Sequence, residues 1–214
     1  MKILALSDEV VPSLYDPSIR ERYGDIDLVV GCGDVPFYYL EFVVSVLNVP
    51  LYYVHGNHDH AKQYMADGRV ATAAEGCVCI DDQVANIDGL TTQAGGLLLA
   101  GLGGSMRYRP GDHQYNEPEM RARARKMALR LWLNRLRHGR FLDILLTHSP
   151  PYGIHDKQDP AHVGFQTFLT MLRRYRPRFM LHGHSHVLRH NAVTRTQYFE
   201  SEIINVYPYR VIEI

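Results

Sequence analysis

Short apolar runs recur along the chain, and longer polar or amphipathic stretches separate them. Within each run the apolar residues are mostly consecutive, a pattern typical of strands buried on both faces. Strands with one face in water would instead alternate apolar and polar residues. We therefore predict five strands of buried sheets, at residues 2–7, 26–31, 50–56, 142–148 and 178–184.

Three of the intervening stretches predict helices. The clearest covers residues 117–138, where Asn116 is a typical N-cap, Pro118 suits the first turn and Gly139 suits the C-terminal cap. Two further helices are expected at about 36–48 and 164–175. Strands that alternate with helices predict an α/β fold.

Residues 76–105 and 191–214 have a different pattern, rich in β-forming residues and, in the first of them, in glycine. They predict further short strands and turns. Together the elements favour two mixed sheets packed face to face with helices outside, a four-layer α-β-β-α sandwich. The chain has no internal repeat, linker or low-complexity tract, so a single domain over 1–214 is expected.

Composition narrows the class of protein only in part. Apolar residues make up 46% and charged residues 21% of the chain, as in ordinary soluble domains. The 23 Lys and Arg balance the 23 Asp and Glu, so the whole molecule has no built-in attraction for nucleic acid or an anionic membrane, although a local basic patch stays open. Three cysteines do not make a disulfide framework, and we interpret Cys77 and Cys79 as small buried residues. No stretch has the pattern of a signal peptide or a membrane span, and a cytoplasmic location is expected.

Ligand-type side chains follow each of the five predicted strands. The carboxyl ends of strands in an α/β sheet line the crevice where ligands bind, so these side chains are expected to converge there. In chain order they are Asp8, Asp34, Asn57 with His58 and Asp59, His148, and His184 with His186.

Carboxylates, an amide oxygen and imidazoles form a mixed oxygen and nitrogen ligand set. Such a set suits divalent ions such as Mn, Fe or Zn, and the lack of thiolates argues against a structural zinc site. The ligands outnumber what one tetrahedral ion needs, which favours two ions. A pair of ions can clamp the attacking and leaving oxygens of a phosphoryl group and activate a water.

Four short motifs resemble those of the calcineurin-like metallophosphoesterase family, in the same order and with similar spacing. They are GD at 33–34, GNHD at 56–59, TH at 147–148 and GHSH at 183–186, and they span nearly the whole chain. The resemblance implies a sandwich fold with a dinuclear site at one edge. It also implies hydrolysis of phosphomonoesters or phosphodiesters by a metal-activated water, without a covalent intermediate.

The resemblance implies a role for each ligand-type residue. Asp34 matches the carboxylate that bridges the two ions. The other ligands of the second ion are Asn57, His148 and His184, and those of the first are Asp8 and His186.

Four further residues near these ligands are not themselves assigned to an ion. His58 matches the unligated histidine that steadies the phosphate and protonates the leaving oxygen, and Asp59 is expected to orient it. His182 and His190 match no ligand position, and we interpret them as supporting or structural residues.

One motif departs from the family pattern. After the first strand the family has D-x-H, whereas this chain has Asp8 followed by Val10 at the place of the histidine. Valine has no lone pair, so the first ion loses a protein ligand. The adjacent Glu9 faces the other way on an extended backbone, and the loop residues His113 and His155 are alternatives. The result is a weakened dinuclear site, a one-metal enzyme or a site kept for binding partners.

The loops beside the expected site supply candidates for substrate binding, namely Arg107, Arg109 and His155. The basic helix at 117–138 is interpreted as a solvated face, with contact to a phosphate-rich substrate as the alternative. We expect one or two divalent transition-metal ions, Mn or Fe preferred and Zn or Ni as alternatives.

The function expected from these observations is a metal-dependent phosphoesterase that acts on a small phosphodiester or nucleotide-like substrate. A nuclease is one alternative. A catalytically weak protein-interaction module, like the retromer subunit that shares this fold, is another. Nucleic acid is disfavoured as a partner, no membrane partner is expected, and a homo-oligomer stays open.

Overall fold

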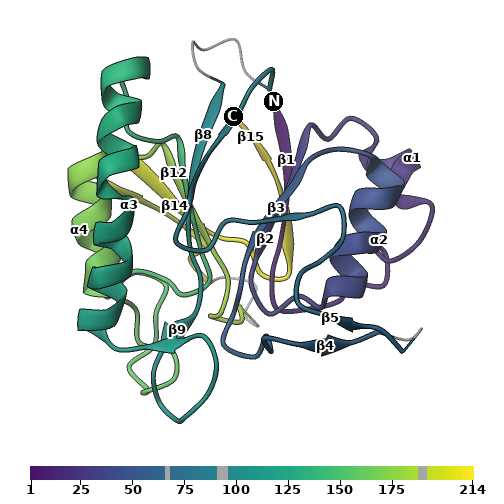
Figure 1. Cartoon of the computed structure of the whole chain (residues 1–214), viewed down its shortest axis with the longest axis horizontal. Helices are drawn as coiled ribbons and strands as arrows, with labels where there is room; N and C mark the ends of the chain where they lie inside the picture. Colours follow the sequence, from purple (N-terminus) through teal and green to yellow (C-terminus); the bar gives the residue numbers. More distant parts are fainter. Residues whose placement is uncertain (66–67, 91–95, 188–191) are drawn as a thin grey trace.

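Two β-sheets lie face to face at the centre of the molecule, and helices cover their outer faces (Figure 1). The computed structural model describes residues 1–65, 68–90, 96–187 and 192–214. The first sheet has the order β15-β1-β2-β3-β6, with β1 at Lys2–Leu6, β2 at Leu28–Cys32, β3 at Leu51–Val54, β6 at Val78–Cys79 and β15 at Tyr209–Glu213. The second has the order β13-β14-β12-β11-β8-β7, with β7 at Val84–Ile87, β8 at Leu97–Leu102, β11 at Ile144–Thr147, β12 at Phe179–His182, β13 at Arg195–Tyr198 and β14 at Ser201–Asn205.

Each sheet has its own helix layer. The helices α1 (Ile19–Tyr23) and α2 (Phe37–Leu47) pack on the first sheet, and α3 (Glu117–His138) and α4 (Gln166–Tyr175) pack on the second (Figure 1). Two small sheets complete the fold, one of β4 (Gln63–Tyr64) with β5 (Val70–Ala71) and one of β9 (Ser105–Met106) with β10 (Gln114–Tyr115). Of the helices in the described residues, none combines the length and the hydropathy needed to cross a bilayer.

Both sheets are mixed. In the first, β1, β2, β3 and β6 run parallel and β15 runs antiparallel at the edge. In the second, β8, β11, β12 and β14 run parallel, and the edge strands β7 and β13 run antiparallel. The two-sheet, four-layer prediction is therefore confirmed.

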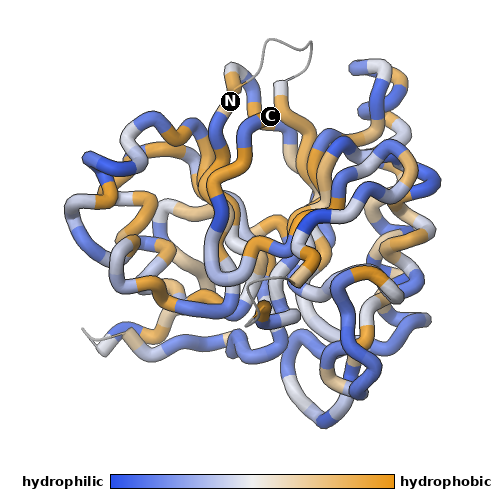
Figure 2. The backbone as a smooth tube through the Cα atoms, turned by 180° about the vertical axis from the view of Figure 1, so that it is seen from behind, coloured by the Kyte–Doolittle hydropathy of each residue, from blue (hydrophilic) through white to orange (hydrophobic). Residues whose placement is uncertain are grey.

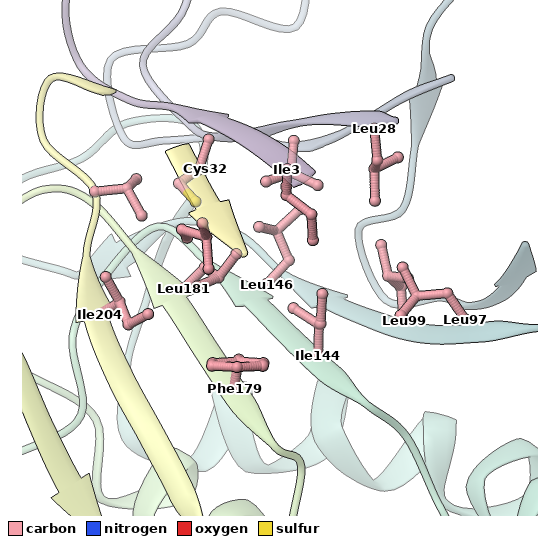
Figure 3. Packing of buried hydrophobic residues seen from close by; sticks show 14 of the residues in the cluster. Ile3, Leu28, Cys32, Leu97, Leu99, Ile144, Leu146, Phe179, Leu181 and Ile204 are labelled. Carbon is pink, nitrogen blue, oxygen red and sulfur yellow. The ribbon is translucent and has the colours of Figure 1, made fainter. Parts of the chain in front are cut away.

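Consecutive residues of a strand face two different apolar clusters, which explains the consecutive apolar runs in the sequence. Ile144 and Leu146 of β11 belong to the cluster between the sheets, together with Leu181 of β12 and Ile3 of β1 (Figure 3). Leu145, between the first two, belongs instead to the cluster under α3 and α4. Apolar segments accordingly run along the central strands, whereas the outer loops are mostly hydrophilic (Figure 2).

All the predicted strands and helices are present, with ends that differ by a few residues at most. The helix α3 begins and ends as predicted because its caps are strong signals. The backbone N of Glu119 donates to the Asn116 side chain at 2.9 Å, and the Glu119 side chain accepts from the Asn116 backbone N at 2.8 Å. The five-residue α1 was not predicted, since so short a helix has no full apolar period.

Candidate metal centre

The candidate metal centre lies at the carboxyl ends of five parallel strands, three from the first sheet and two from the second. The strands β1, β2 and β3 lead into Asp8, Asp34 and Asn57, and β11 and β12 lead into His148 and His184. Carboxylate oxygens of Asp8 and Asp34 and a ring nitrogen of His148 all lie within 4.8 Å of one another. The fold thus brings ligands from both sheets to one point.

Three of these residues stand two positions after their strands in the same unusual conformation. Asp8, Asp34 and His184 have left-handed backbones, with φ of 65°, 55° and 63°. For a residue other than glycine, the left-handed backbone conformation costs on the order of 1 kcal/mol or more of folding free energy. Hydrogen bonds hold the turns: the backbone N of His58 donates to Asp34 Oδ1 at 2.7 Å, and that of His184 donates to Asp8 Oδ2 at 2.9 Å.

His148 is fully buried, and its two ring nitrogens meet different partners. Nδ1 donates to the carbonyl oxygen of Cys32 at 2.8 Å, so Nε2 carries the lone pair of the neutral ring. Nε2 lies 3.0 Å from Asn57 Oδ1 and 3.3 Å from Asp34 Oδ2. Three atoms with lone pairs therefore face one another, and a proton or a metal ion between them makes this arrangement favourable. Burial disfavours the charged ring, but the carboxylates, Asp34 foremost, raise the pKa of His148 to about 9.

This donor set fits a divalent metal ion. A ligating histidine commonly donates its other N–H to a carbonyl, and His148 and His184 both do so, His184 through Nε2 to the carbonyl oxygen of Ala161 at 2.7 Å. Burial and the charge of His148 lower the pKa of His184 to about 3, which keeps its ring neutral, the form that binds metals. Among the described residues, the buried Asn57 Nδ2 group has no hydrogen-bond partner, while Oδ1 of the same amide faces His148.

Asp8 and His186 form the more open part of the centre. Nε2 of His186 lies 3.4 Å from Asp8 Oδ1, and the His186 ring stacks on Tyr207 with the centroids 4.6 Å apart. Burial of Asp8 favours its neutral form, but the contact with His186 and the charge of His148 outweigh it and lower the pKa of Asp8. Sequence reasoning missed Tyr207, because a tyrosine in a β-rich tail carries no signal of a metal site.

Asp59 joins two of the ligand-bearing turns. Its Oδ2 accepts from the backbone N of Asp34 at 2.9 Å and from that of Gly56 at 2.8 Å. Burial and the nearby charge of Asp34 raise the pKa of Asp59 to about 6. The expected contact with the His58 ring is not among the hydrogen bonds of the described residues. Asp59 instead binds backbone N–H groups of the turns that carry the ligands.

Positions 56 and 183 require glycine because side chains of the centre lie very close to the backbone there. A Cβ atom on Gly56 would lie 2.1 Å from Asp34 Oδ1, and one on Gly183 would lie 1.7 Å from Ser7 Oγ and 2.4 Å from Asp8 Oδ2. Any larger residue at either position would displace a carboxylate of the centre. The glycines of the GNHD and GHSH motifs therefore make room for the ligands.

A hollow of about 530 Å³ opens beside the ligands. It is lined by Asp34, Pro36, His58, Asp59, His60, Lys62, Gln63 and Tyr64. His58 is exposed, and among the described residues its ring has no hydrogen bond with a ligand. The position is compatible with contact to a substrate, and the catalytic role expected for His58 stays a prediction.

Val10, at the place of the missing histidine, is half-buried and packs against the apolar cluster between the first sheet and its helices. The Glu9 carboxylate accepts a hydrogen bond from the Tyr207 hydroxyl at 2.9 Å. His113 stacks on His55, with the centroids 4.4 Å apart. None of these three contacts brings a metal ligand to the Asp8 side of the centre.

Both ring nitrogens of His155 contact other side chains of the protein. Nδ1 lies 3.0 Å from Nε2 of the fully buried His182, and Nε2 lies 2.8 Å from the Thr196 hydroxyl. His182 also contacts the Gly183 carbonyl through Nδ1 at 3.0 Å, which places it behind the GHSH turn and supports its interpretation as a supporting residue. His190 lies outside the described residues.

Arg107 and Arg109 lie on a separate surface. They line a hollow of about 590 Å³ together with Tyr108, Pro110 and Gly111, and no ligand of the metal centre contributes to it. The Arg107 guanidinium binds the Glu119 carboxylate, at 2.8 and 3.0 Å. Its contact with a substrate stays a prediction that would require this ion pair to open.

His55, Cys79 and Asp81 form another group of metal-type side chains. Nδ1 of His55 lies 2.6 Å from Asp81 Oδ2 and 3.6 Å from Cys79 Sγ. Asp81 also accepts from the backbone N of Gly103 at 2.6 Å, and the Arg123 guanidinium lies 3.5 Å away. The carboxylate is thus already balanced by cations and N–H donors, and we interpret the group as an ion-pair network. Cys77 and Cys79, interpreted from the sequence as buried, are both only half-buried.

The model of the calcineurin-like phosphoesterase family matches residues 15–188, so the chain belongs to this family of metal-dependent phosphoester hydrolases. No curated protein is significantly similar to the chain in sequence.

Solved structures share the fold. The protein TT1561 of Thermus thermophilus superimposes with a TM-score of 0.61 at 16% identity, over 96% of this chain and 88% of its own. Another crystal structure gives a TM-score of 0.62 at 14% identity, over 96% of this chain and 90% of its own. At these identities the likeness concerns the fold alone.

Proposed function

We propose that this protein hydrolyses a small phosphodiester or nucleotide-like phosphoester with water, at one or two divalent ions. The observation that carries the proposal is the convergence of lone-pair donors from both sheets beside an open hollow. The residues that would hold the ions are Asp8, Asp34, Asn57, His148, His184 and His186.

The protein's own groups prepare this centre before a substrate arrives. Backbone hydrogen bonds fix Asp34 and Asp8, and carbonyl oxygens set the ring orientation of His148 and His184. Bound ions would polarise a phosphoryl oxygen and lower the pKa of a water. His58, at the edge of the hollow, would hold the proton that the leaving oxygen takes up.

The mixed ligand set supports the expectation of Mn or Fe, with Zn or Ni as alternatives. One amide and two carboxylates accompany the imidazoles, and cysteine sulfur contributes no ligand atom within the described residues of this centre. Mixed sets of oxygen atoms and imidazole nitrogens suit borderline divalent ions of this kind.

The hollow supports a small substrate. Its volume of about 530 Å³ is within the usual range for sites that take small molecules. Lys62 supplies a cation for a phosphate or carboxylate, and Tyr64, whose side chain is 84% exposed, offers an aromatic face for a planar group such as a nucleobase.

Metal analysis and a substrate panel test the proposal. The purified protein is stripped, reloaded with Mn, Fe, Zn, Ni or Mg, and assayed on phosphomonoesters, small phosphodiesters, oligonucleotides and plasmid DNA. We expect turnover of small phosphodiesters to exceed that of nucleic acid, and to be lost in His148→Ala. Faster cleavage of nucleic acid would make the protein a nuclease, and no turnover with any ion would favour an interaction module.

A further inference from the structure

The zero net charge of the chain conceals a strong separation of charge. Residues 1–119 contain 7 Lys and Arg against 17 Asp and Glu, whereas residues 120–214 contain 16 against 6. The first part contains α1 and α2 and ends in the first turn of α3, and the second contains the rest of α3 and α4, on the opposite side of the sandwich from α1 and α2 (Figure 1). The sequence-based expectation that the protein does not attract anionic surfaces rested on its net charge, which sums the acidic and the basic part.

The helix α3 has a second apolar side, opposite to its buried one. Leu129, Trp132, Leu133 and Leu136 are three or four residues apart and so form one stripe along the helix. Their exposed fractions are 71%, 45%, 38% and 78%, and all four are among the exposed large hydrophobic residues of the described chain. A contiguous exposed apolar stripe of this kind marks an interaction surface.

Basic residues flank this stripe on both sides. They are Arg121, Arg125, Lys126, Arg130, Arg135 and Arg137, all exposed, and none has an ion-pair partner within the described ranges. From Met120 to Leu142 the sequence contains no Asp or Glu. Long basic side chains beside leucine and tryptophan are typical of helices that lie in the interface of an anionic membrane.

A groove next to the stripe offers a place for an anionic head group. It lies between α3 and α4, has a volume of about 190 Å³, and includes Arg121, Arg125 and Arg174 with Thr167 and Thr170 among its lining residues. The three guanidinium groups can donate to the oxygen atoms of a phosphate. The two hydroxyl groups already donate within the protein, Thr167 to Glu117 Oε1 and Thr170 to the carbonyl oxygen of Gln166.

We propose that the exposed face of α3 docks the protein on an anionic phospholipid bilayer, with the four apolar residues in the interfacial region and the flanking basic residues at the phosphates. A nucleic acid would contact the arginines, but it would leave the highly exposed Leu129 and Leu136 without an apolar partner. A second copy facing the same stripe would bring six unpaired cations against six others. The lipid surface alone matches both the charge and the apolar stripe.

Vesicle cosedimentation of the full chain tests this docking. The vesicles are phosphatidylcholine alone or phosphatidylcholine with a third of phosphatidylglycerol, at low and at high salt. The stripe variant is the double substitution Leu129→Ser and Leu136→Ser, and the charge variant is Arg125→Glu with Arg130→Glu. Val193→Ser and Arg20→Glu are matched controls, since both positions are exposed and lie outside this face.

The wild type should bind the anionic vesicles at low salt, and high salt should weaken the binding. Each basic residue near such a surface is worth about fivefold in affinity, so the charge variant should bind at least about tenfold more weakly. The stripe variant should also bind at least about tenfold more weakly, while the controls bind as the wild type does. Circular dichroism and urea denaturation confirm that each variant is folded.

Absence of binding to anionic vesicles, or binding that neither variant weakens, overturns the proposal. Two further measurements separate the other occupants. Oligonucleotide binding that the charge variant alone loses would assign the face to nucleic acid. Self-association in analytical ultracentrifugation that the stripe variant loses would assign it to a second copy. Neither outcome depends on the proposed hydrolytic function, because the variants leave the metal centre intact.

Discussion

Nε2 of His148 lies 3.3 Å from Oδ2 of Asp34, although the two residues follow strands of different sheets. The contact holds a cation in one of two forms, a proton on the ring or a metal ion between the two groups. It also links the halves of the sandwich at the point where both sheets end. The centre is therefore sensitive to any change that moves one sheet relative to the other.

The first prediction separates ligation from proton transfer. His148→Ala should remove at least one metal equivalent, because a buried ring nitrogen is lost from the donor set. His58→Ala should keep the full metal content and lower kcat by roughly 10²–10⁴, the usual range for a positioned acid or base. Elemental analysis and steady-state kinetics on the same samples provide the two readouts. Loss of metal in His58→Ala would show that His58 is a ligand.

The second prediction concerns Asp59, whose carboxylate holds the turns of Asp34 and Gly56. Asp59→Ala would leave the buried N–H group of Gly56 and the partly buried N–H group of Asp34 without an acceptor, at a cost of up to about 1–3 kcal/mol each in the free energy of unfolding. Both bonds end on Oδ2, so the one amide oxygen of Asp59→Asn can accept from both N–H groups, and this variant should lose less than Asp59→Ala. Urea denaturation of the metal-stripped proteins measures the difference. Equal stability of the alanine variant and the wild type would contradict this role.

The residues of the centre could be predicted from the sequence because each one directly follows a buried strand. Parallel strands of one sheet end at one edge, so the positions of Asp8 and Asp34 imply that they lie close together. His148 follows a strand of the second sheet, and it reaches them because the two sheets pack face to face. The contacts that hold them could not be predicted in the same way. The stacking of Tyr207 on His186 and the backbone contacts of Asp59 depend on loop conformations that no periodic pattern encodes.

The charge distribution illustrates a second limit of prediction from the sequence. A net charge of zero is a sum over the chain, whereas attraction to a partner depends on which face carries the charge. The apolar positions of α3 were likewise ambiguous. The same spacing of three and four residues describes both the buried side, with Met127 and Leu131, and the exposed side, with Leu129 and Leu136.

The third prediction is a loss of stability in acid. Burial lowers the pKa of His155 to about 4 and that of His182 to about 3, while in the unfolded chain both titrate near 6.5. Below pH 6.5 the unfolded state therefore binds more protons, so stability present above pH 6.5 is lost as the pH falls towards 4. His155→Gln removes one of these groups. Between pH 7 and pH 5 the variant should lose about 1–2 kcal/mol less of unfolding free energy than the wild type.

Metal-stripped protein is used for these measurements, so that titration of the ligands is common to wild type and variant. His138→Gln, at the end of α3, is the control and should follow the wild type. Parallel pH profiles of wild type and His155→Gln would mean that His155 titrates in the folded protein as it does in the unfolded chain.

The last prediction concerns the ion on the Asp8 side. With Val10 at the place of a ligand, this ion would be held by Asp8, Asp34 and His186 alone, and it should leave first on dialysis against a mild chelator. The ion held by Asn57 and the buried histidines should stay. Titration calorimetry of the two sites measures both affinities.

Val10→His should tighten the weaker site, because an imidazole would replace a water in the ligand set. Val11→His is the matched control, since Val11 is also half-buried and packs against the same apolar cluster. Activity need not rise in Val10→His, because an open coordination position can serve to take the substrate. If Val10→His is folded and leaves both affinities unchanged, residue 10 does not face the ions, and the protein has replaced the D-x-H motif with another arrangement.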